Sequence, residues 1–389
     1  MNILFLIDRY PGFGGIETVT TVLANFFLNQ NYQVAIISHR QENEDLLEKL
    51  HQPVRLFKFP NKQLKVSSEN ETYLKQVISE FQPNYIINQE SYSGLFKLLI
   101  TIKNEISCKI ITVEHNSPVA RYKMLVNHLE NEKLQFSIKG VLKKIGHPFI
   151  LWKSLYEERK YHQKVYRLSD EYILLSKRFI PILKKIGGFE SVAKIKVIEN
   201  PVTIIPEVVD IKRKEKIVLY LGRLDYSQKR VDRLLKIWKK TTPHVPEWKL
   251  IIVGDGPDRG KLENYVTKHK IATIFFEGSQ TNVERYYSKS AILCLTSNVE
   301  GFPLVLAEAM TFGCVPIVYN SFESVSDIID DKINGRLITP FDEQKFIEAL
   351  VELIQDTSER ENMSQKAIEM CDRFSLERIG DKWNNLLKK

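Results

Sequence analysis

Two glutamates eight residues apart form the first pattern with a clear chemical use. Glu300 and Glu308 enclose a predicted loop-to-helix transition, because Gly301 and Pro303 stand between them and an apolar helical pattern follows. Eight residues are about two helical turns, so the two carboxylates can address one elongated ligand from the same side. A glutamate inside an apolar helix is costly without a partner. A pair of sugar hydroxyls is a suitable partner.

A second group of side chains carries positive charge at the end of a predicted strand. The segment 220–230 follows an apolar run, precedes a helical pattern and contains Arg223 and Lys229. Ligands of parallel sheets bind at the carboxyl ends of strands. A planar guanidinium and a compact ammonium at this position can converge on a diphosphate. The alternative interpretation is a pair of solvated surface charges.

Two glycine-rich turns follow other predicted strands. The first, 11–17, has glycines at positions 12, 14 and 15 ahead of a helical pattern. Glycine lets the backbone approach a ligand, and the N–H groups of a helix start can meet an anion. The spacing matches neither the dinucleotide pattern G-x-G-x-x-G nor a P-loop. The second turn is Gly254–Pro257, in which Asp255 favours a helix cap.

Strands and helices that alternate along the chain must position these segments. Most expected strands are rich in Ile, Val and Leu without polar alternation, as strands covered on both faces are. They are residues 2–7, 33–38, 54–57, 85–88, 109–113, 172–175, 196–199, 216–220, 249–253, 274–277, 291–295 and 315–319. Amphipathic segments such as 17–29, 231–241 and 259–269 predict helices between them. The pattern predicts an α/β protein with doubly wound parallel sheets.

The expected domain boundary lies where this alternation is interrupted, at Glu199-Asn200-Pro201. A chain of 389 residues is long enough for two domains. We expect an N-terminal Rossmann-like domain over 1–200, a second over 201–374, and a cleft between them as the site. A last helix is expected over 375–389, and its return to the first domain is one interpretation.

The composition excludes several classes of protein. With 43% hydrophobic and 27% charged residues, the chain is neither a disordered protein nor a fibrous one. Its net charge of +8 (56 basic minus 48 acidic residues) fits an anionic partner such as a nucleotide or a lipid headgroup. The four cysteines form no CxxC pair, which indicates a reducing compartment. No apolar run reaches the ~18 residues of a transmembrane helix, and residues 2–7 are expected to form a strand rather than a signal peptide.

One segment departs from the alternation of strands and helices. Residues 121–167 contain eleven Lys or Arg and four Glu, interleaved with aromatic side chains. Part of this length must be a crossover helix, and 121–151 is interpreted as an inserted basic, aromatic element. Two interpretations stay open for it. It is either a solvated helix with a buried aromatic stripe, or a site for a membrane surface or a lipid-linked acceptor.

With these motifs in place, the chain resembles the retaining glycosyltransferases of the GT-B fold, glycosyltransferase family 4 of the bacterial polysaccharide type. The resemblance covers essentially the whole chain and is densest over 220–340. Glu300 and Glu308 match the family's Glu-x7-Glu signature, and Gly14-Gly15 match its first glycine-rich loop. Gly222, Arg223 and Lys229 match its Gly-Arg…Lys-Gly stretch, although Arg230 stands where a glycine is common. Asn334-Gly335 resembles the turn before its last β-α unit.

The resemblance implies roles for these residues. Glu308 would bind ribose hydroxyls, Glu300 the donor sugar, and Arg223 with Lys229 the pyrophosphate. His115 matches the family's histidine near the donor sugar, so the implied catalytic residues are Glu300, His115, Arg223 and Lys229. The implied donor-binding residues are Gly14, Gly15, Arg223, Lys229, Gly278, Gln280, Gly301, Phe302, Leu304, Val305 and Glu308.

The implied reaction moves a hexose or N-acetylhexosamine from a nucleotide-sugar, with a UDP-sugar favoured, to a lipid-linked or surface-polysaccharide acceptor. The sequence contains no Asp-x-Asp, so we expect no metal and no cofactor, and cations with helix N-termini would stabilise the leaving diphosphate. The resemblance implies a cytoplasmic enzyme, with peripheral contact at the inner face of the cytoplasmic membrane left open. No nucleic-acid-binding motif appears.

Other functions were weighed against this one. A GT-B-fold nucleotide-sugar epimerase would use a similar donor but needs no membrane-side acceptor. The basic aromatic segment favours such an acceptor and therefore argues against an epimerase. A non-catalytic nucleotide-sugar-binding protein stays a further alternative. A Rossmann oxidoreductase is disfavoured because the G-x-G-x-x-G pattern is missing.

Overall fold

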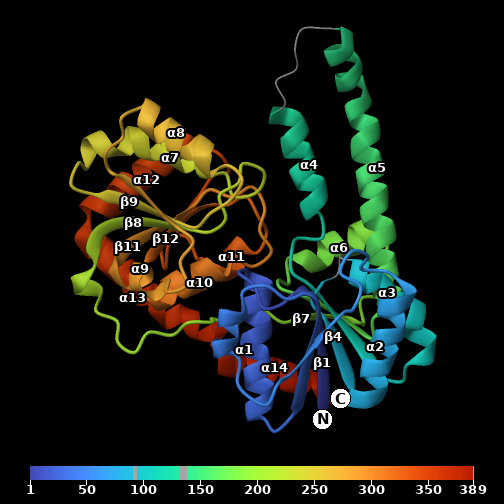
Figure 1. Ribbon diagram of the computed structural model, residues 1–389. Coiled ribbons are helices and arrows are strands. Elements are labelled where there is room, and N and C mark those ends of the chain that lie inside the picture. The colour runs from blue at the N-terminus through green and yellow to red at the C-terminus, as the bar shows by residue number, and fades with distance from the viewer. Residues whose placement is uncertain (91–93, 132–137, 389) are drawn as a thin grey trace. The chain divides into compact units, whose positions relative to one another are not determined.

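The computed structural model describes residues 1–90, 94–131 and 138–388 (Figure 1). The expected insertion over 121–151 therefore lies partly outside the described residues. Two compact units make up the chain. Unit 1 comprises Met1–Pro118, Leu155–Thr203 and Leu376–Lys389, and unit 2 comprises Val119–Ser154 and Ile204–Ser375.

The described part of unit 1 contains a seven-stranded sheet in which every pairing is parallel. Its strands are β1 (Asn2–Arg9), β2 (Gln33–Arg40), β3 (Arg55–Lys58), β4 (Tyr85–Asn88), β5 (Lys109–Glu114), β6 (Glu171–Leu174) and β7 (Ile195–Val197), in the order β3-β2-β1-β4-β5-β6-β7. Its helices are α1 (Gly15–Asn29), α2 (Ser68–Phe81), α3 (Gly94–Ile102), the end of α5 (Ile138–Leu168), α6 (Phe179–Gly187) and α14 (Leu376–Leu387).

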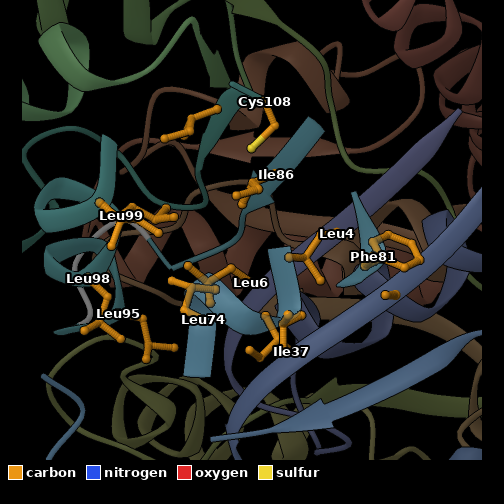
Figure 2. Packing of buried hydrophobic residues seen from close by; sticks show 14 of the residues in the cluster. Leu4, Leu6, Ile37, Leu74, Phe81, Ile86, Leu95, Leu98, Leu99 and Cys108 are labelled. Atoms are coloured by element: carbon orange, nitrogen blue, oxygen red, sulfur yellow. The ribbon is translucent and has the colours of Figure 1, made fainter. Parts of the chain in front are cut away.

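The core of unit 1 is continuous from the sheet to the helices that cover it. Helix α2 begins at a cap, because the Ser67 side chain accepts a hydrogen bond from the Asn70 N–H at 3.1 Å. Its buried residues Leu74, Val77 and Phe81 recur at helical spacing. Figure 2 shows the cluster to which this face contributes, with side chains from β1, β2, β4, α2 and α3: Leu4, Leu6, Ile37, Ile86, Leu74, Phe81, Leu95, Leu98 and Leu99.

Unit 2 repeats the same topology with a six-stranded parallel sheet. Its strands are β8 (Glu215–Leu221), β9 (Lys249–Val253), β10 (Ile274–Gly278), β11 (Ser290–Leu295), β12 (Val315–Tyr319) and β13 (Arg336–Ile338), in the order β10-β9-β8-β11-β12-β13. Its helices are α4 (Ala120–Asn131), the first part of α5, α7 (Val231–Thr241), α8 (Arg259–Lys268), α9 (Glu284–Lys289), α10 (Leu304–Thr311), α11 (Val325–Ile328), α12 (Glu343–Gln355) and α13 (Thr357–Cys371).

The structure confirms the predicted doubly wound parallel sheets, and each of the expected strands is present within about three residues of its predicted bounds. Strand β13 was not predicted. It has three residues, Arg336–Ile338, and pairs with β12 at the end of the sheet. A segment this short carries no readable periodicity, so its conformation depends on pairing that the local sequence does not encode.

Two segments lie in a different unit from their neighbours in sequence. The expected division assigned residues 119–154 to the N-terminal domain, whereas they group with unit 2, where Lys123 of α4 pairs with Glu323 at 2.5 Å. The last helix, α14, belongs to unit 1. Its Trp383 packs edge to face against Phe27 of α1, with ring centroids 6.2 Å apart, and the Tyr85 hydroxyl donates to the Leu387 carbonyl at 2.8 Å.

Two further findings concern the state of the cysteines and the apolar character of the helices. All four cysteines are buried and unpaired by disulfides. Over the described ranges, we find no helix whose length and apolar character would let it cross a bilayer.

We predict that Trp383→Ala destabilises unit 1. The side chain is 3% exposed, and its loss leaves a cavity beside Phe27, which should lower the free energy of unfolding by about 3–5 kcal/mol. Urea unfolding followed by circular dichroism measures this change. Trp152→Ala is the matched control, because Trp152 is 59% exposed and its loss should change stability by less than about 0.5 kcal/mol. Equal effects of the two substitutions would contradict the docking of α14.

Candidate active site

Each sheet has one topological switch point, the position at which its strand order reverses. In unit 1 this point lies between β1 and β4, and in unit 2 between β8 and β11. Ligands of open parallel sheets bind outside the carboxyl ends of the strands at such points. The loops after β8, β9, β10 and β11 in unit 2, and after β1, β4 and β5 in unit 1, are therefore the places to examine.

Three glycines let the strand-end loops of unit 2 pack backbone against backbone. The Gly254 N–H donates to the Gly278 carbonyl at 2.8 Å, and the Gly222 N–H donates to the Val253 carbonyl at 3.0 Å. A Cβ at Gly254, whose φ is 130°, would lie 2.0 Å from the Gly222 carbonyl oxygen. Gly278 has a φ of 69°, in the region that favours glycine. These glycines thus hold the loops after β8, β9 and β10 together.

Asp225 shapes the loop that carries the expected diphosphate-binding cations. Its side chain is buried, and its Oδ1 accepts hydrogen bonds from the Gln228 N–H at 2.7 Å and the Lys229 N–H at 3.2 Å. The bonded turn ends just before α7, which begins at Val231. Asp225 was not among the predicted site residues. The signal for it was an aspartate three residues before Gln228 in a strand-to-helix loop, the spacing of a side-chain-bonded turn.

Asn298 joins this loop to the one after β11. Its N–H donates to the Gln228 carbonyl at 2.7 Å, and its side-chain amide donates to the Ser227 carbonyl at 3.0 Å. Arg233 of α7 donates to the Asn298 side-chain oxygen at 2.6 Å. The two loops at the switch point are therefore fixed to each other by both backbone and side-chain bonds.

This arrangement brings Lys229 and Glu300 together. The Lys229 Nζ donates to Glu300 Oε1 at 2.7 Å and to Oε2 at 2.9 Å, and the Ser297 hydroxyl donates to Oε1 at 2.7 Å. The Lys229 side chain is 19% exposed and the Glu300 side chain is 6% exposed. A carboxylate this buried needs a positive partner and hydrogen bonds, and Lys229 with Ser297 supplies both. An ammonium has three donors, so Lys229 retains one N–H for a ligand.

Glu308 lies further along, on the fifth residue of α10. Pro303 is the N-cap of this helix, no side chain caps it, and its first N–H groups, including those of Leu304 and Val305, have no partner within the helix. Glu308 is 6% exposed and accepts a hydrogen bond from the Tyr287 hydroxyl at 2.9 Å. Burial and the Glu308 carboxylate raise the pKa of Tyr287 well above its usual value, so Tyr287 stays a donor. Sequence reasoning missed Tyr287 because 21 residues separate it from Glu308.

The remaining predicted residues of unit 2 range from exposed to buried. The Arg223 side chain is 70% exposed, with its Nε 3.9 Å from Asp225 Oδ2. Gln280 donates to the Glu277 carbonyl at 2.7 Å and accepts from Arg285 at 2.9 Å. Phe302 is buried against Phe374, edge to face, with ring centroids 5.1 Å apart. Gly301, just before Phe302, is likewise buried.

In unit 1, His115 follows β5 and contacts the residue that follows β4. Its Nε2 lies 2.7 Å from the Gln89 side-chain oxygen, which can only accept, so Nε2 carries the proton. Burial lowers the pKa of His115 to about 4, so the ring is neutral at pH 7 and its Nδ1 is an acceptor. Gln89 was not predicted. It is 1% exposed, and its Nε2 has no hydrogen-bond partner within the described part of the chain.

The first glycine-rich loop ends at the start of α1. Gly14 is the N-cap and Gly15 the first helical residue. A Cβ at Gly14 would lie 2.3 Å from the Glu17 carboxylate, which accepts from Arg9 at 2.9 Å. The absence of a side chain at Gly14 thus makes room for the Arg9–Glu17 ion pair beside the helix start.

The fold is that of the GT-B glycosyltransferases. The sequence model described as "Glycosyl transferases group 1" matches residues 202–370, and the one described as "Glycosyltransferase Family 4" matches residues 13–204. The chain therefore belongs to the glycosyltransferases that these two models describe, and it is an enzyme of that class.

Relatives and solved structures agree with this class. An amylovoran biosynthesis glycosyltransferase of Erwinia amylovora is 26% identical over 99% of both chains. An alpha-1,4-N-acetyl-D-galactosaminyltransferase of Campylobacter jejuni, named for an acceptor on PP-undecaprenol, is 26% identical over 100% of this chain and 98% of its own. A solved complex of a TarM variant of S. aureus with fondaparinux, alpha-GlcNAc-glycerol and UDP has a TM-score of 0.77 and 14% identity, with 100% of both chains covered. The last likeness shows the fold.

We predict that Lys229 and Glu300 are energetically coupled. Lys229→Met or Glu300→Gln alone should lower the free energy of unfolding, whereas the double variant should lose less than the sum, giving a coupling energy of about 1–3 kcal/mol. Chemical unfolding of the four proteins measures it. Lys366 and Glu369, each 48% exposed, are the control pair and should show less than about 0.5 kcal/mol. A coupling no larger than the control would contradict the assignment.

We also predict that His115 makes stability depend on pH. Its pKa in the folded state is about 4, below the usual 6.5, so the unfolded chain binds the proton more readily. The contribution is therefore complete above about pH 6.5 and is lost as the pH falls towards 4. Between pH 7 and 5 the wild type should lose about 2 kcal/mol more than His115→Gln. The exposed His51→Gln is the control, and its pH dependence should follow the wild type.

Proposed function

We propose that the protein is a retaining, metal-independent glycosyltransferase that moves a hexose or N-acetylhexosamine from a UDP-sugar to a lipid-linked or surface-polysaccharide acceptor. The observation that carries the proposal is the Lys229–Glu300–Ser297 cluster at the switch point of unit 2, with Glu308 on the next helix. It provides a held carboxylate, a cation with a free donor and a helix N-terminus in one unit.

Each group would meet a different part of the donor. The Glu308 carboxylate would accept hydrogen bonds from the ribose hydroxyls, with Tyr287 holding it in place. The third N–H of Lys229, the Arg223 guanidinium and the first N–H groups of α10 would donate to the diphosphate oxygens. Glu300, already held by Lys229 and Ser297, would accept hydrogen bonds from the donor sugar. The TarM complex that shares the fold contains UDP, which supports the choice of base.

The chemistry follows from these contacts. The bond between the anomeric carbon and the β-phosphate oxygen breaks, and both electrons stay on the departing UDP, where the cations and the α10 N-terminus stabilise them. An acceptor hydroxyl forms the new bond to the anomeric carbon from the same face, and its proton goes to the departing phosphate oxygen. The anomeric configuration is thereby retained. His115, neutral at pH 7, would accept a hydrogen bond at Nδ1 from a sugar hydroxyl.

The acceptor class rests on the relatives. The Campylobacter jejuni relative, aligned over 100% of this chain, is named for a saccharide on PP-undecaprenol. We extend that chemistry to this protein, with a lipid diphosphate-linked saccharide as the first acceptor to test.

UDP binding tests the donor assignment. In calorimetry with EDTA present, UDP should bind the wild type, and Glu308→Gln should weaken binding by about ten- to a hundredfold, because a charged acceptor of two hydroxyls becomes a neutral one. Glu348→Gln on the exposed face of α12 is the matched control and should bind like the wild type.

Transfer assays test the rest of the proposal. The sugar of the product should keep the donor's anomeric configuration in its proton NMR couplings, and EDTA should leave the rate unchanged. Loss of transfer in EDTA would contradict the proposed metal independence. A product with the inverted anomeric configuration would contradict the proposed retaining mechanism. Equal UDP affinity in Glu308→Gln and the wild type would contradict the proposed binding of the ribose hydroxyls by Glu308.

A further inference from the structure

Unit 2 contains a cavity of about 450 Å³ at the end of its sheet away from the candidate active site. Among the lining residues, Lys214 and Lys216 stand on either side of the first residue of β8. Trp248 directly precedes β9, and Gly313 lies two residues before β12. These are the amino ends of parallel strands, whereas the candidate active site follows their carboxyl ends. Since β8 has seven residues, about 20 Å of strand separate the two places. We call it the amino-end cavity.

The amino-end cavity combines buried apolar residues with positive charge. Val245, Trp248, Ala291 and Ile354 line it and are at most 5% exposed. The lining also includes four Lys or Arg and two Glu, a net charge of +2 with histidine neutral. Its volume lies within the range of small-molecule sites, about 300–1,000 Å³. The cavity is therefore complementary to a small organic anion.

Lys214 carries a positive charge that no carboxylate balances. Its Nζ donates to the Tyr287 carbonyl at 2.7 Å and lies 3.9 Å from the Cys314 Sγ, and it has no other partner among the described residues. Burial raises the pKa of the Cys314 thiol to about 11, so the sulfur is neutral at pH 7. Burial also lowers the pKa of Lys214. An ammonium has three donors, so one N–H is left for a ligand.

Arg360 of α13 supplies a second charge of this kind. Its guanidinium donates to the carbonyls of Leu353 and Ile354 at 2.6 and 3.0 Å and to the Thr357 hydroxyl at 3.1 Å. Its Cζ also lies 5.3 Å from the centroid of the Trp248 ring. All of these partners are neutral. Since a guanidinium has five N–H groups, two of them are left for a ligand.

The acidic residues near the cavity do not neutralise these charges. Glu247 is paired with Lys216 at 3.5 Å. Glu361 and Asp356 attract Arg360 without forming an ion pair with it in the described part of the chain. Burial outweighs their attraction, because the pKa of Arg360 is lower than its ordinary value. The lining therefore keeps an excess of positive charge.

We propose that the amino-end cavity binds a small phosphate monoester at a site separate from the donor site. The phosphate accepts hydrogen bonds from the remaining N–H groups of Lys214 and Arg360, and the organic part lies against Trp248 and Val245. A monoester carries a charge of about −1.5 to −2 at pH 7, which matches the charge of the lining. A bare phosphate would leave most of the volume empty. The inference goes beyond the proposed function and does not rest on it.

Calorimetry on the full chain with phenyl phosphate tests the site. The wild type should bind this ester at least about fivefold more tightly than inorganic phosphate, because the ring gains apolar contacts. Benzyl alcohol has the ring without the charge and should not bind at the same concentrations. Lys214→Met should weaken ester binding by about tenfold or more, because a charged donor is lost. The Tyr287 carbonyl still accepts from the Cys314 Sγ at 3.1 Å in this variant, so the fold should be kept.

A second substitution tests the charge without changing a buried side chain. Gln355 lies on the lining and is exposed, and Gln355→Glu should weaken ester binding by about fivefold, because it adds a negative charge beside the phosphate. Gln365→Glu is the matched control, at an exposed position of α13 outside the lining, and should bind like the wild type. Arg223→Met should also bind the ester like the wild type, because Arg223 follows the carboxyl end of β8.

Four results would overturn the proposal: no ester binding by the wild type, equal affinity in Lys214→Met and the wild type, equal binding of benzyl alcohol, or a loss of affinity in Arg223→Met. The last result would place the ester in the donor site. Equal affinity for the ester and for inorganic phosphate would overturn the choice of an ester. A protein that binds phenyl phosphate but not UDP would reject only the proposed function, and one that binds UDP but not phenyl phosphate would reject only this inference.

Discussion

A buried carboxylate at the switch point of unit 2 sets the constraint on which the arrangement of this site depends. Glu300 is 6% exposed on its side chain, and a charge so far from water is tolerated only with a cation and further donors close by. Lys229 is the cation that bonds to Glu300, and the turn at Asp225 holds the Lys229 backbone in position for this bond. The Asn298 bonds then keep the two loops at one separation. The glycines after β8, β9 and β10 let neighbouring loops approach closely enough for this packing.

The sheets and most of their bounds could be predicted because the information is local. Fully buried parallel strands are runs of Ile, Val and Leu, and β4, β9 and β12 begin and end at the predicted residues. The sequence failed where three-dimensional pairing decides the conformation. Strand β13 is too short to show a period, and residues 119–154 follow contacts such as Lys123–Glu323, which join positions 200 residues apart.

The candidate site divides in the same way. Glu300, Glu308 and Lys229 could be found from residue type and spacing, since each follows a strand in a loop-to-helix segment. That Lys229 and Glu300 would bond to each other was not predicted, because 71 residues separate them and both had been given separate ligand roles. Tyr287 and Gln89 were missed for the same reason. A tyrosine or a glutamine has no motif of its own, and its importance appears only when the fold brings it to a carboxylate or an imidazole.

The two units satisfy their buried polar groups differently. Among the described residues of unit 2, the buried side-chain atoms without a hydrogen-bond partner are His147 Nε2, Ser290 Oγ, Ser324 Oγ and Arg373 Nε, none of which lies in the loops that hold Lys229 and Glu300. In unit 1 the side-chain amide nitrogens of Asn88 and Gln89 both lack a hydrogen-bond partner among the described residues, where β4 ends beside the switch point. Each buried donor left unpaired destabilises the folded state by on the order of 1–3 kcal/mol, and no hydrogen bond within the protein offsets this cost. The internal bonds of unit 2 therefore fix its site before any ligand arrives, whereas unit 1 carries unused hydrogen-bonding capacity at the corresponding point, next to His115.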